Sequence, residues 1–263
     1  MFGGVYVSVE QPSAPPLCAS WREIAGRELG VVRFRRFVIH THLIVPRERL
    51  ERTLDPYLRG MVQPGDTLAI SEKAVAIAEG RLVLLRSVRA RRLAVFLARR
   101  VRDRGYGMGF RRPETMEMAI HEAGPVRILL AAAAAALTRP CGRSGDFYRV
   151  AGRRVAAIDG PTAHTIPPYD RYIVLAPVRG GRLCRRLARR LGIKVAVVDV
   201  NDVGSEVLEA SAGVDRAAVK RLLDDNPMGQ GAGATPLVVL RADSRQTASR
   251  DQYNGDAGGA RRQ

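Results

Sequence analysis

The sequence predicts an α+β fold in which mixed sheets pack with helices. Apolar runs typical of buried strands, such as residues 67–71 and 195–200, occur along the same chain as amphipathic helical patterns. These patterns do not follow a regular βαβ rhythm, so α+β is favoured over a doubly wound parallel sheet. The 263 residues are enough to bury a sizeable core, and no internal repeat divides them.

Composition divides the chain into three parts. Residues 1–36 are rich in proline, glycine and arginine and show little periodicity, so we expect a poorly ordered N-terminal extension. Residues 242–263 contain no aliphatic side chain larger than alanine and therefore predict a disordered tail, because they cannot bury enough surface to fold. The folded α+β domain is expected between them, over residues 37–241.

The first half of this domain mixes strands with helices. Leu50, Leu54 and Leu58 recur every fourth residue, which indicates a helix. Pro113 suits the first turn of another, where a missing N–H costs nothing. The most apolar run, residues 128–137, is expected to be a buried helix. The predicted strands cover residues 37–45, 67–71 and 82–85, and the predicted helices cover residues 47–58, 93–101, 113–122 and 128–137.

The second half continues the mixture. Gly152 separates two short apolar runs and suggests a hairpin. Leu183, Leu187 and Leu191 lie on one side of an amphipathic helix whose other positions are mostly arginine. The predicted elements are the hairpin of residues 147–150 and 155–158, strands over residues 172–176, 195–200 and 237–240, and helices over residues 181–191 and 217–223.

The chain carries a formal net charge of +17. Only three basic residues are lysine, so 40 of the 43 are arginine, a ratio that also fits the coding bias of a GC-rich genome. A basic chain suggests nucleic acid or another polyanion as partner. The aromatic residues that stack on single strands are not interleaved with the arginines, which disfavours nucleic acid. Residues 81–112 contain eleven arginines and one acid, Asp103. These arginines form either a solvated surface or a polyanion-binding surface.

Cysteine usage and hydropathy predict a cytoplasmic protein that has no membrane partner. Cys18, Cys141 and Cys184 are odd in number, lie far apart and form no C-x-x-C motif, which indicates free thiols. No signal peptide is apparent in residues 1–20. The apolar run of residues 128–137 is about half the roughly 20 residues that a membrane span needs.

Polar residues at the end of a buried strand are the strongest chemical signal. Asp199 and Asn201 lie two residues apart, so on an extended chain both side chains project to one face. Oxygen ligands of this kind suit Mg²⁺ or Mn²⁺. The alternative is a helix cap, in which Asp202 or Ser205 opens a short helix over residues 206–210.

Three further groups could carry chemistry. Residues 228–231, M-G-Q-G, could cradle a phosphate with backbone N–H groups, although the chain contains no Walker A motif. Asp159 lies where a strand meets a Gly-Pro turn, where an aspartate commonly only forms the turn. His40 and His42 alternate on a predicted strand, and strand packing explains them better than a metal site, because no third ligand accompanies them.

Four blocks together resemble the coenzyme F420-0:L-glutamate ligases, the gamma-glutamyl ligases of deazaflavin coenzyme biosynthesis, as a divergent branch. They occur in the family's order within about residues 37–241. The blocks are G-D-T-L-A-I-S-E-K-A-V-A-I-A-E-G-R (65–81), A-A-I-D-G-P (156–161), V-V-D-V-N-D (197–202) and M-G-Q-G (228–231).

The resemblance implies the family's own α+β fold, a homodimer, and GTP with divalent metal (Mg²⁺ or Mn²⁺) in gamma-glutamyl amide formation on coenzyme F420-0. By position, Asp159, Asp199 and Gln230 match metal ligands. Gly229, Gln230, Gly231 and Asn201 would contact the nucleotide.

The chain also departs from the family pattern. Ile77 replaces a lysine, Gln230 replaces a glutamate, and the N-terminal G-L-P segment has no counterpart. An alternative is therefore a non-catalytic member of the fold that binds a phosphate-bearing ligand or polyanion through its arginine-rich face.

Overall fold

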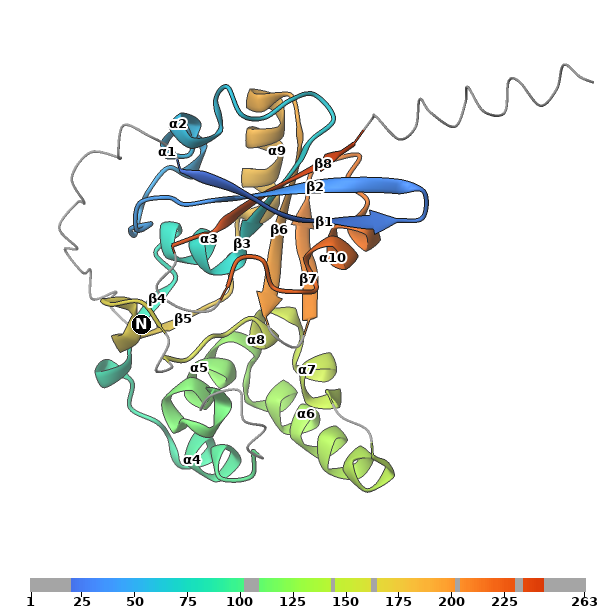
Figure 1. Cartoon of the computed structure of the whole chain (residues 1–263). Coiled ribbons are helices and arrows are strands. Elements are labelled where there is room, and N and C mark those ends of the chain that lie inside the picture. Colours follow the sequence, from blue (N-terminus) through green and yellow to red (C-terminus); the bar gives the residue numbers. More distant parts are fainter. Residues whose placement is uncertain are drawn as a thin grey trace, which may run out of the picture.

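A computed structural model describes residues 20–101, 109–142, 145–161, 165–201, 204–229 and 234–243. Its centre is a six-stranded mixed sheet with the strand order β1-β2-β8-β3-β6-β7 (Figure 1). The mixture of one mixed sheet with helices confirms the predicted α+β class. The strands are β1 (Trp21–Leu29), β2 (Val32–Ile39), β3 (Thr67–Ser71), β6 (Lys194–Asn201), β7 (Gly204–Ala210) and β8 (Leu237–Ala242).

The only parallel pair in this sheet is β3 with β6, and every other neighbouring pair is antiparallel. Ser71 is opposite Val198, so β3 and β6 end at the same edge of the sheet. Ile70 is opposite Leu237, which places the beginning of β8 at that edge too. We call this edge the carboxyl edge. It brings together chain segments that are more than 100 residues apart in sequence.

Helices cover both faces of the sheet because its strands are buried on both sides. One face, with Val195 and Val197, packs against α3, α9 and the short α1 and α2. The opposite face, with Ala196 and Val198, packs against α10. These helices are α1 (Leu50–Thr53), α2 (Asp55–Leu58), α3 (Glu72–Ala78), α9 (Gly180–Leu191) and α10 (Arg216–Leu223).

A second group of helices lies below the sheet in Figure 1 and has its own core. We call α4–α8 the helical lobe. A two-stranded sheet, β4 (Leu82–Leu84) with β5 (Tyr172–Val174), adjoins it. The helices are α4 (Arg92–Ala98), α5 (Pro113–Ala123), α6 (Pro125–Thr138), α7 (Asp146–Ala151) and α8 (Arg153–Ala156), and four 3₁₀ turns cover Leu85–Ser87, Gly109–Arg111, Arg139–Cys141 and Tyr169–Arg171.

The predicted extension and domain boundary differ from the structure. Within residues 1–36, residues 21–36 form β1 and the first part of β2, so the boundary expected at residue 37 falls inside a strand. These residues are paired rather than loose, because β2 bonds to both β1 and β8. Residues 1–19 and 244–263, which make up the rest of the extension and nearly all of the tail, lie outside the described residues.

Two local predictions are wrong in the helical lobe. The hairpin expected around Gly152 is a pair of short helices, α7 and α8. Gly152 has a φ of 97°, which lets the chain turn sharply between them. The helix over residues 128–137 exists within α6, but it is not buried: among its described side chains, only Ile128 and Ala131 are.

The remaining predicted elements agree closely with the structure, apart from the strand of residues 37–45 and the helix of residues 47–58. The strand prediction is wrong beyond Ile39, where β2 ends. The helix is split into α1 and α2, with Pro56 in the first turn of the second piece. Cys184 is a free thiol on the buried side of α9. Among the described helices, none is by itself long and apolar enough to cross a membrane, and only α5 and α6, bent by 115°, reach that length and composition together.

Candidate functional site

Acidic and basic side chains meet at the carboxyl edge. Glu72 and Lys73 follow directly after β3, at the start of α3. Asp199 and Asn201 belong to the last residues of β6. Asp159 is held beside them by backbone pairing with Val174, whose N–H and C=O both bond to Asp159 at 2.9 Å. Parallel strands whose carboxyl ends meet at one edge are a common place for ligand sites.

Alternation along β6 decides which way Asp199 points. Val195 and Val197 face the core under α3 and α9, so Asp199, two residues further, faces the same side. Glu206 on β7 is the direct cross-strand partner of Asp199. Like charges placed opposite each other in a sheet destabilise it unless a counter-charge lies nearby.

We call Glu72, Asp159, Asp199 and Glu206 the carboxylate cluster. Burial, followed by the charges of Asp199 and Asp159, raises the pKa of Glu72 well above its ordinary value. Burial, followed by the charge of Asp159, also raises the pKa of Asp199. Both shifts have the same physical causes, because each of these two carboxyl groups is itself desolvated and lies near other negative charges.

Two basic side chains partly neutralise the cluster. Lys73 Nζ forms an ion pair with Asp159 Oδ2. Arg153 Nε lies 3.9 Å from Glu206 Oε1 at the exposed rim. Four carboxylates against two cations leave an excess of two negative charges when all the groups are ionised. A divalent cation would supply that difference.

Glu72 is the most constrained member of the cluster. Its side chain is only 8% exposed, and its Oε2 atom is buried without a hydrogen-bond partner. Leaving a buried carboxylate oxygen unsatisfied is costly, and such an atom commonly marks a place where an ion or ligand binds. In the described part of the chain, however, no three His, Cys, Asp or Glu side chains converge closely enough to hold one metal ion.

The glycine-rich loop reaches the same edge. Gly229 follows α10 in a turn with a φ of 71°. The end of the loop is anchored by two backbone bonds, from Ser71 N to Pro236 O at 2.8 Å and from Thr41 N to Ala234 O at 3.0 Å. The two other predicted loop residues, Gln230 and Gly231, lie outside the described residues.

Asp159, Asp199 and Asn201 are therefore brought to one edge, as the hypothesis of a ligand site requires. Asn201 Nδ2 lies 3.5 Å from Asp199 Oδ1, which is at the limit of a hydrogen bond. The alternative, a helix opened by Asp202 or Ser205, is wrong, because residues 206–210 lie in strand β7.

The histidines do not belong to this site. Strand β2 ends at Ile39, so His40 and His42 do not alternate on a strand as predicted. The His42 ring lies between Tyr57 Oη at 2.9 Å and Glu48 Oε1 at 2.8 Å, and this network ties the segment after β2 to α2. Hydrogen bonding rather than strand packing explains His42.

Sequence reasoning missed Glu72 and assigned Lys73 no role. The available signal was position: an acidic and a basic residue directly after an apolar strand that ends at the carboxyl edge. Ile77, which replaces a lysine of the resembled family, is 6% exposed and packs in the core beneath the sheet. Lys73 lies four residues earlier on α3 and provides a positive charge at the edge itself.

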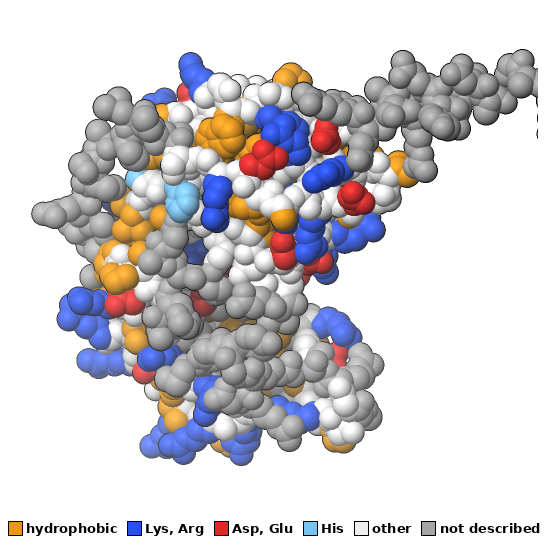
Figure 2. All heavy atoms as spheres, viewed as in Figure 1, with side chains coloured by type: hydrophobic (Ala, Val, Ile, Leu, Met, Phe, Trp, Pro, Cys, Tyr) orange, Lys and Arg blue, Asp and Glu red, His pale blue; other side chains and the backbone are white. Residues whose placement is uncertain are grey.

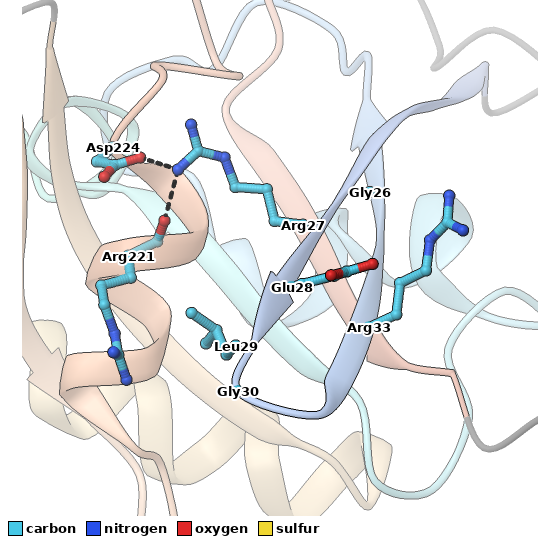
Figure 3. A pocket seen from close by; sticks show the side chains of 8 residues that line it. All are labelled: Gly26, Arg27, Glu28, Leu29, Gly30, Arg33, Arg221 and Asp224. Atoms are coloured by element: carbon cyan, nitrogen blue, oxygen red, sulfur yellow. Dashed lines mark hydrogen bonds and ion pairs between the residues drawn. The ribbon is translucent and has the colours of Figure 1, made fainter. Parts of the chain in front are cut away.

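A second polar hollow lies far from the carboxyl edge. It has a volume of about 710 Å³ between α10 and the turn that joins β1 to β2 (Figure 3). Arg27 crosses this hollow and bonds to Arg221 O at 2.9 Å and to the Asp224 carboxylate. Two charged groups of its lining, Arg27 and Asp224, thus neutralise each other.

Neither a protein-family model nor a curated protein matches this sequence. The resemblance to the gamma-glutamyl ligases therefore stays an expectation from the four short sequence blocks.

Proposed function

We propose that the carboxylate cluster binds a divalent cation together with a phosphate-bearing substrate, and that the chain is a ligase-like enzyme. In this proposal it forms an amide, such as a gamma-glutamyl bond, on a carboxylate acceptor such as coenzyme F420-0, with GTP as the possible co-substrate. The observation that carries the proposal is the buried, unpartnered Oε2 of Glu72 in a cluster with excess negative charge.

The donor set fits Mg²⁺ or Mn²⁺ in the presence of a nucleotide. Mg²⁺ in proteins is commonly bound by only one or two carboxylates, while phosphate oxygens and water complete the coordination. A site formed jointly with phosphate does not need three preformed protein ligands. Asp159 and Asp199 are the proposed ligands, and Gln230 would add a neutral oxygen from the loop.

The chain's other residues would orient the phosphate. Lys73 would leave Asp159 when a cation arrives and donate hydrogen bonds to phosphate oxygens instead. By the resemblance, the backbone N–H groups of Gly229 and Gly231 would donate to the phosphate, and Asn201 at the end of β6 would contact the nucleotide. The bound metal would neutralise phosphate charge as it develops during phosphoryl transfer.

Assembly and location are further parts of the proposal. The resemblance supports a homodimer that acts on a small-molecule substrate, and the cysteine usage supports a cytoplasmic location. A non-catalytic binding protein of the same fold is the alternative. It would bind a phosphate-bearing ligand or polyanion through its arginine-rich face and would form no product.

The test is a thermal-shift titration of the full chain with Mn²⁺, with and without GTP or ATP. A ligand at a hundredfold excess over its Kd stabilises the folded state by about 2.7 kcal/mol. We expect a nucleotide shift that needs Mn²⁺ and is lost in Asp159→Asn and Glu72→Gln. Glu28→Gln, an equivalent change on β1 far from the cluster, is the matched control and should keep the shift.

Product formation separates the two functions. Mass spectrometry of acceptor, glutamate and nucleotide mixtures should show a glutamylated product for an active ligase. A shift without product would favour the binding protein. A shift equally large in wild type, Asp159→Asn and Glu72→Gln would exclude the carboxylate cluster as the metal site.

A further inference from the structure

Helix α6 exposes an apolar stripe that the rest of the described chain does not cover. Val126, Leu130 and Leu137 are 69%, 60% and 78% exposed, and Ala133 between them is also exposed. Their spacing of four, three and four residues places all four side chains on one side of the helix. The opposite side, with Ile128 and Ala131, is buried in the lobe. The helix is therefore apolar on both sides, and one side lacks a partner within the lobe.

The same lobe is strongly basic at its surface. Among its described residues, none of the four carboxylates (Glu114, Glu117, Glu122 and Asp146) is exposed. Glu117 and Asp146 are buried, and both take part in ion pairs with arginines. Figure 2 shows basic side chains along the lower part of the molecule, where the lobe lies. Nine exposed arginines belong to the lobe: Arg92, Arg99, Arg100, Arg111, Arg127, Arg139, Arg149, Arg153 and Arg154.

Arginines flank the apolar stripe at both ends. Arg127 lies in the first turn of α6, and Arg139 follows its last residue. Elsewhere in the lobe, Phe96 on α4 has a half-exposed ring, and the Arg100 guanidinium lies 3.4 Å from its centroid. Apolar side chains bordered by basic and aromatic groups are typical of helices that lie in the interface of a membrane.

We infer that the helical lobe docks on an anionic phospholipid surface, with the stripe of α6 inserted among the acyl chains and the arginines on the headgroups. This peripheral contact differs from a membrane span and departs from the expectation of no membrane partner. It is independent of the proposed catalytic function, because α6 does not contribute to the carboxylate cluster.

Charge complementarity selects this partner over two others. A second copy docked through the same lobe would bring two surfaces of equal positive charge together, which costs free energy. A nucleic acid would satisfy the arginines but offers no apolar phase for Leu130 and Leu137. Of these three partners, the anionic bilayer is the one that offers negative charge to the exposed arginines and an apolar phase to the stripe.

The test is co-sedimentation of the full chain with vesicles of phosphatidylcholine alone and of phosphatidylcholine mixed with phosphatidylserine. Each arginine near an anionic surface contributes about fivefold to partitioning. We expect binding to the mixed vesicles only, with an at least tenfold loss in Leu130→Gln/Leu137→Gln at unchanged net charge. Val31→Gln, a similarly exposed residue next to the β1–β2 turn, is the control and should bind like wild type.

Charge variants complete the test. Arg99→Gln/Arg100→Gln in the lobe should weaken binding more than Arg185→Gln/Arg189→Gln on α9, which removes the same charge. Equal binding by wild type and Leu130→Gln/Leu137→Gln would overturn the proposal and indicate charge attraction alone. Two other outcomes would point to a different partner and overturn the proposal. If Leu130→Gln/Leu137→Gln converted a dimer to a monomer in sedimentation, the stripe would be an interface between copies. If the chain bound RNA but not the mixed vesicles, with equal affinity in wild type and in the leucine variant, the arginines would serve a nucleic acid. Circular dichroism should show that each variant is folded.

Discussion

The sheet with its covering helices and the helical lobe use similar residues in opposite ways. In the sheet region, apolar side chains are buried on both faces of the strands. Its helix α9 is rich in arginine, but Arg186 and Arg190 lie 3.0 Å from carboxylates of Glu51 and Asp55. In the lobe, leucines of α6 and many arginines face outward, with no exposed carboxylate among the described residues.

This difference separates internal stability from interaction. Outside the carboxylate cluster, the sheet region pairs charges of α9 within the chain and buries the apolar side chains of its central strands. Exposed apolar and like-charged groups do not satisfy one another, and contiguous surfaces of this kind mark interaction sites. The comparison teaches that composition alone does not assign a role to arginine or leucine, because their neighbours decide it.

The largest expected difference is in the unfolding free energy when leucine is replaced by alanine once in the sheet and once in the lobe. Leu68→Ala removes a fully buried side chain from β3 and should cost about 2–5 kcal/mol of unfolding free energy. Leu130→Ala on α6 should change it by less than about 0.5 kcal/mol, because the side chain is already exposed. Urea denaturation of both variants measures the contrast. A cost above about 2 kcal/mol for Leu130→Ala would mean that α6 is covered in solution.

The second-largest loss of unfolding free energy should come from breaking the ion pair between the buried Arg36 and the partly exposed Asp225. Arg36 on β2 is 2% exposed and donates to Asp225 Oδ1 at 2.6 Å and Oδ2 at 2.9 Å. It also donates to Leu222 O at 2.9 Å, so one side chain ties β2 to the end of α10. Removing a partner from a buried pair costs about 3–5 kcal/mol. We expect a cost near the lower end, about 3 kcal/mol, for Asp225→Asn, because Asp225 itself is partly exposed.

The pH dependence of this pair has a definite sign. Burial would raise the pKa of Asp225, but the hydrogen bond and charge of Arg36 outweigh it and hold the pKa below its ordinary value. The folded state therefore binds the proton less readily than the unfolded state, and the contribution is present above the unfolded pKa of about 3.9. It is lost as the pH falls through the lower, folded pKa. Asp225→Asn should abolish this dependence, and an unchanged acid transition would contradict the assignment.

The central strands of the sheet could be predicted because each is an uninterrupted run of apolar residues in the sequence. The strand over residues 67–71 is found with the predicted bounds, since an apolar run between Asp66 and Glu72 leaves little choice. The lobe was less predictable. The short apolar runs beside Gly152 suit a hairpin as well as two helices, and packing against α5 and α6 decides between them.

The candidate site was predictable only in part. Asp199 could be selected from its position near a strand end and Asp159 only from the resemblance, and the structure brings both to the carboxyl edge. Glu72 could not be recognised, because glutamate is normally exposed and its burial depends on how α3 lies against β6. The ion pair between Lys73 and Asp159 likewise depends on contacts across 86 positions in sequence.

The smallest expected changes in unfolding free energy compare the arginines of α9 with those of the helical lobe. Asp55→Asn removes the acceptor of Arg190 and Arg59 on the sheet side and should cost about 1 kcal/mol or less, since these arginines are exposed. Arg99→Gln in the lobe should be neutral or slightly stabilising, because it relieves repulsion with the neighbouring exposed Arg100. Denaturation at low and high salt measures both changes, and salt should shrink each of them. Equal destabilisation by the two substitutions would show that the lobe's arginines are neutralised within the chain, which would remove the contrast from which an anionic partner was inferred.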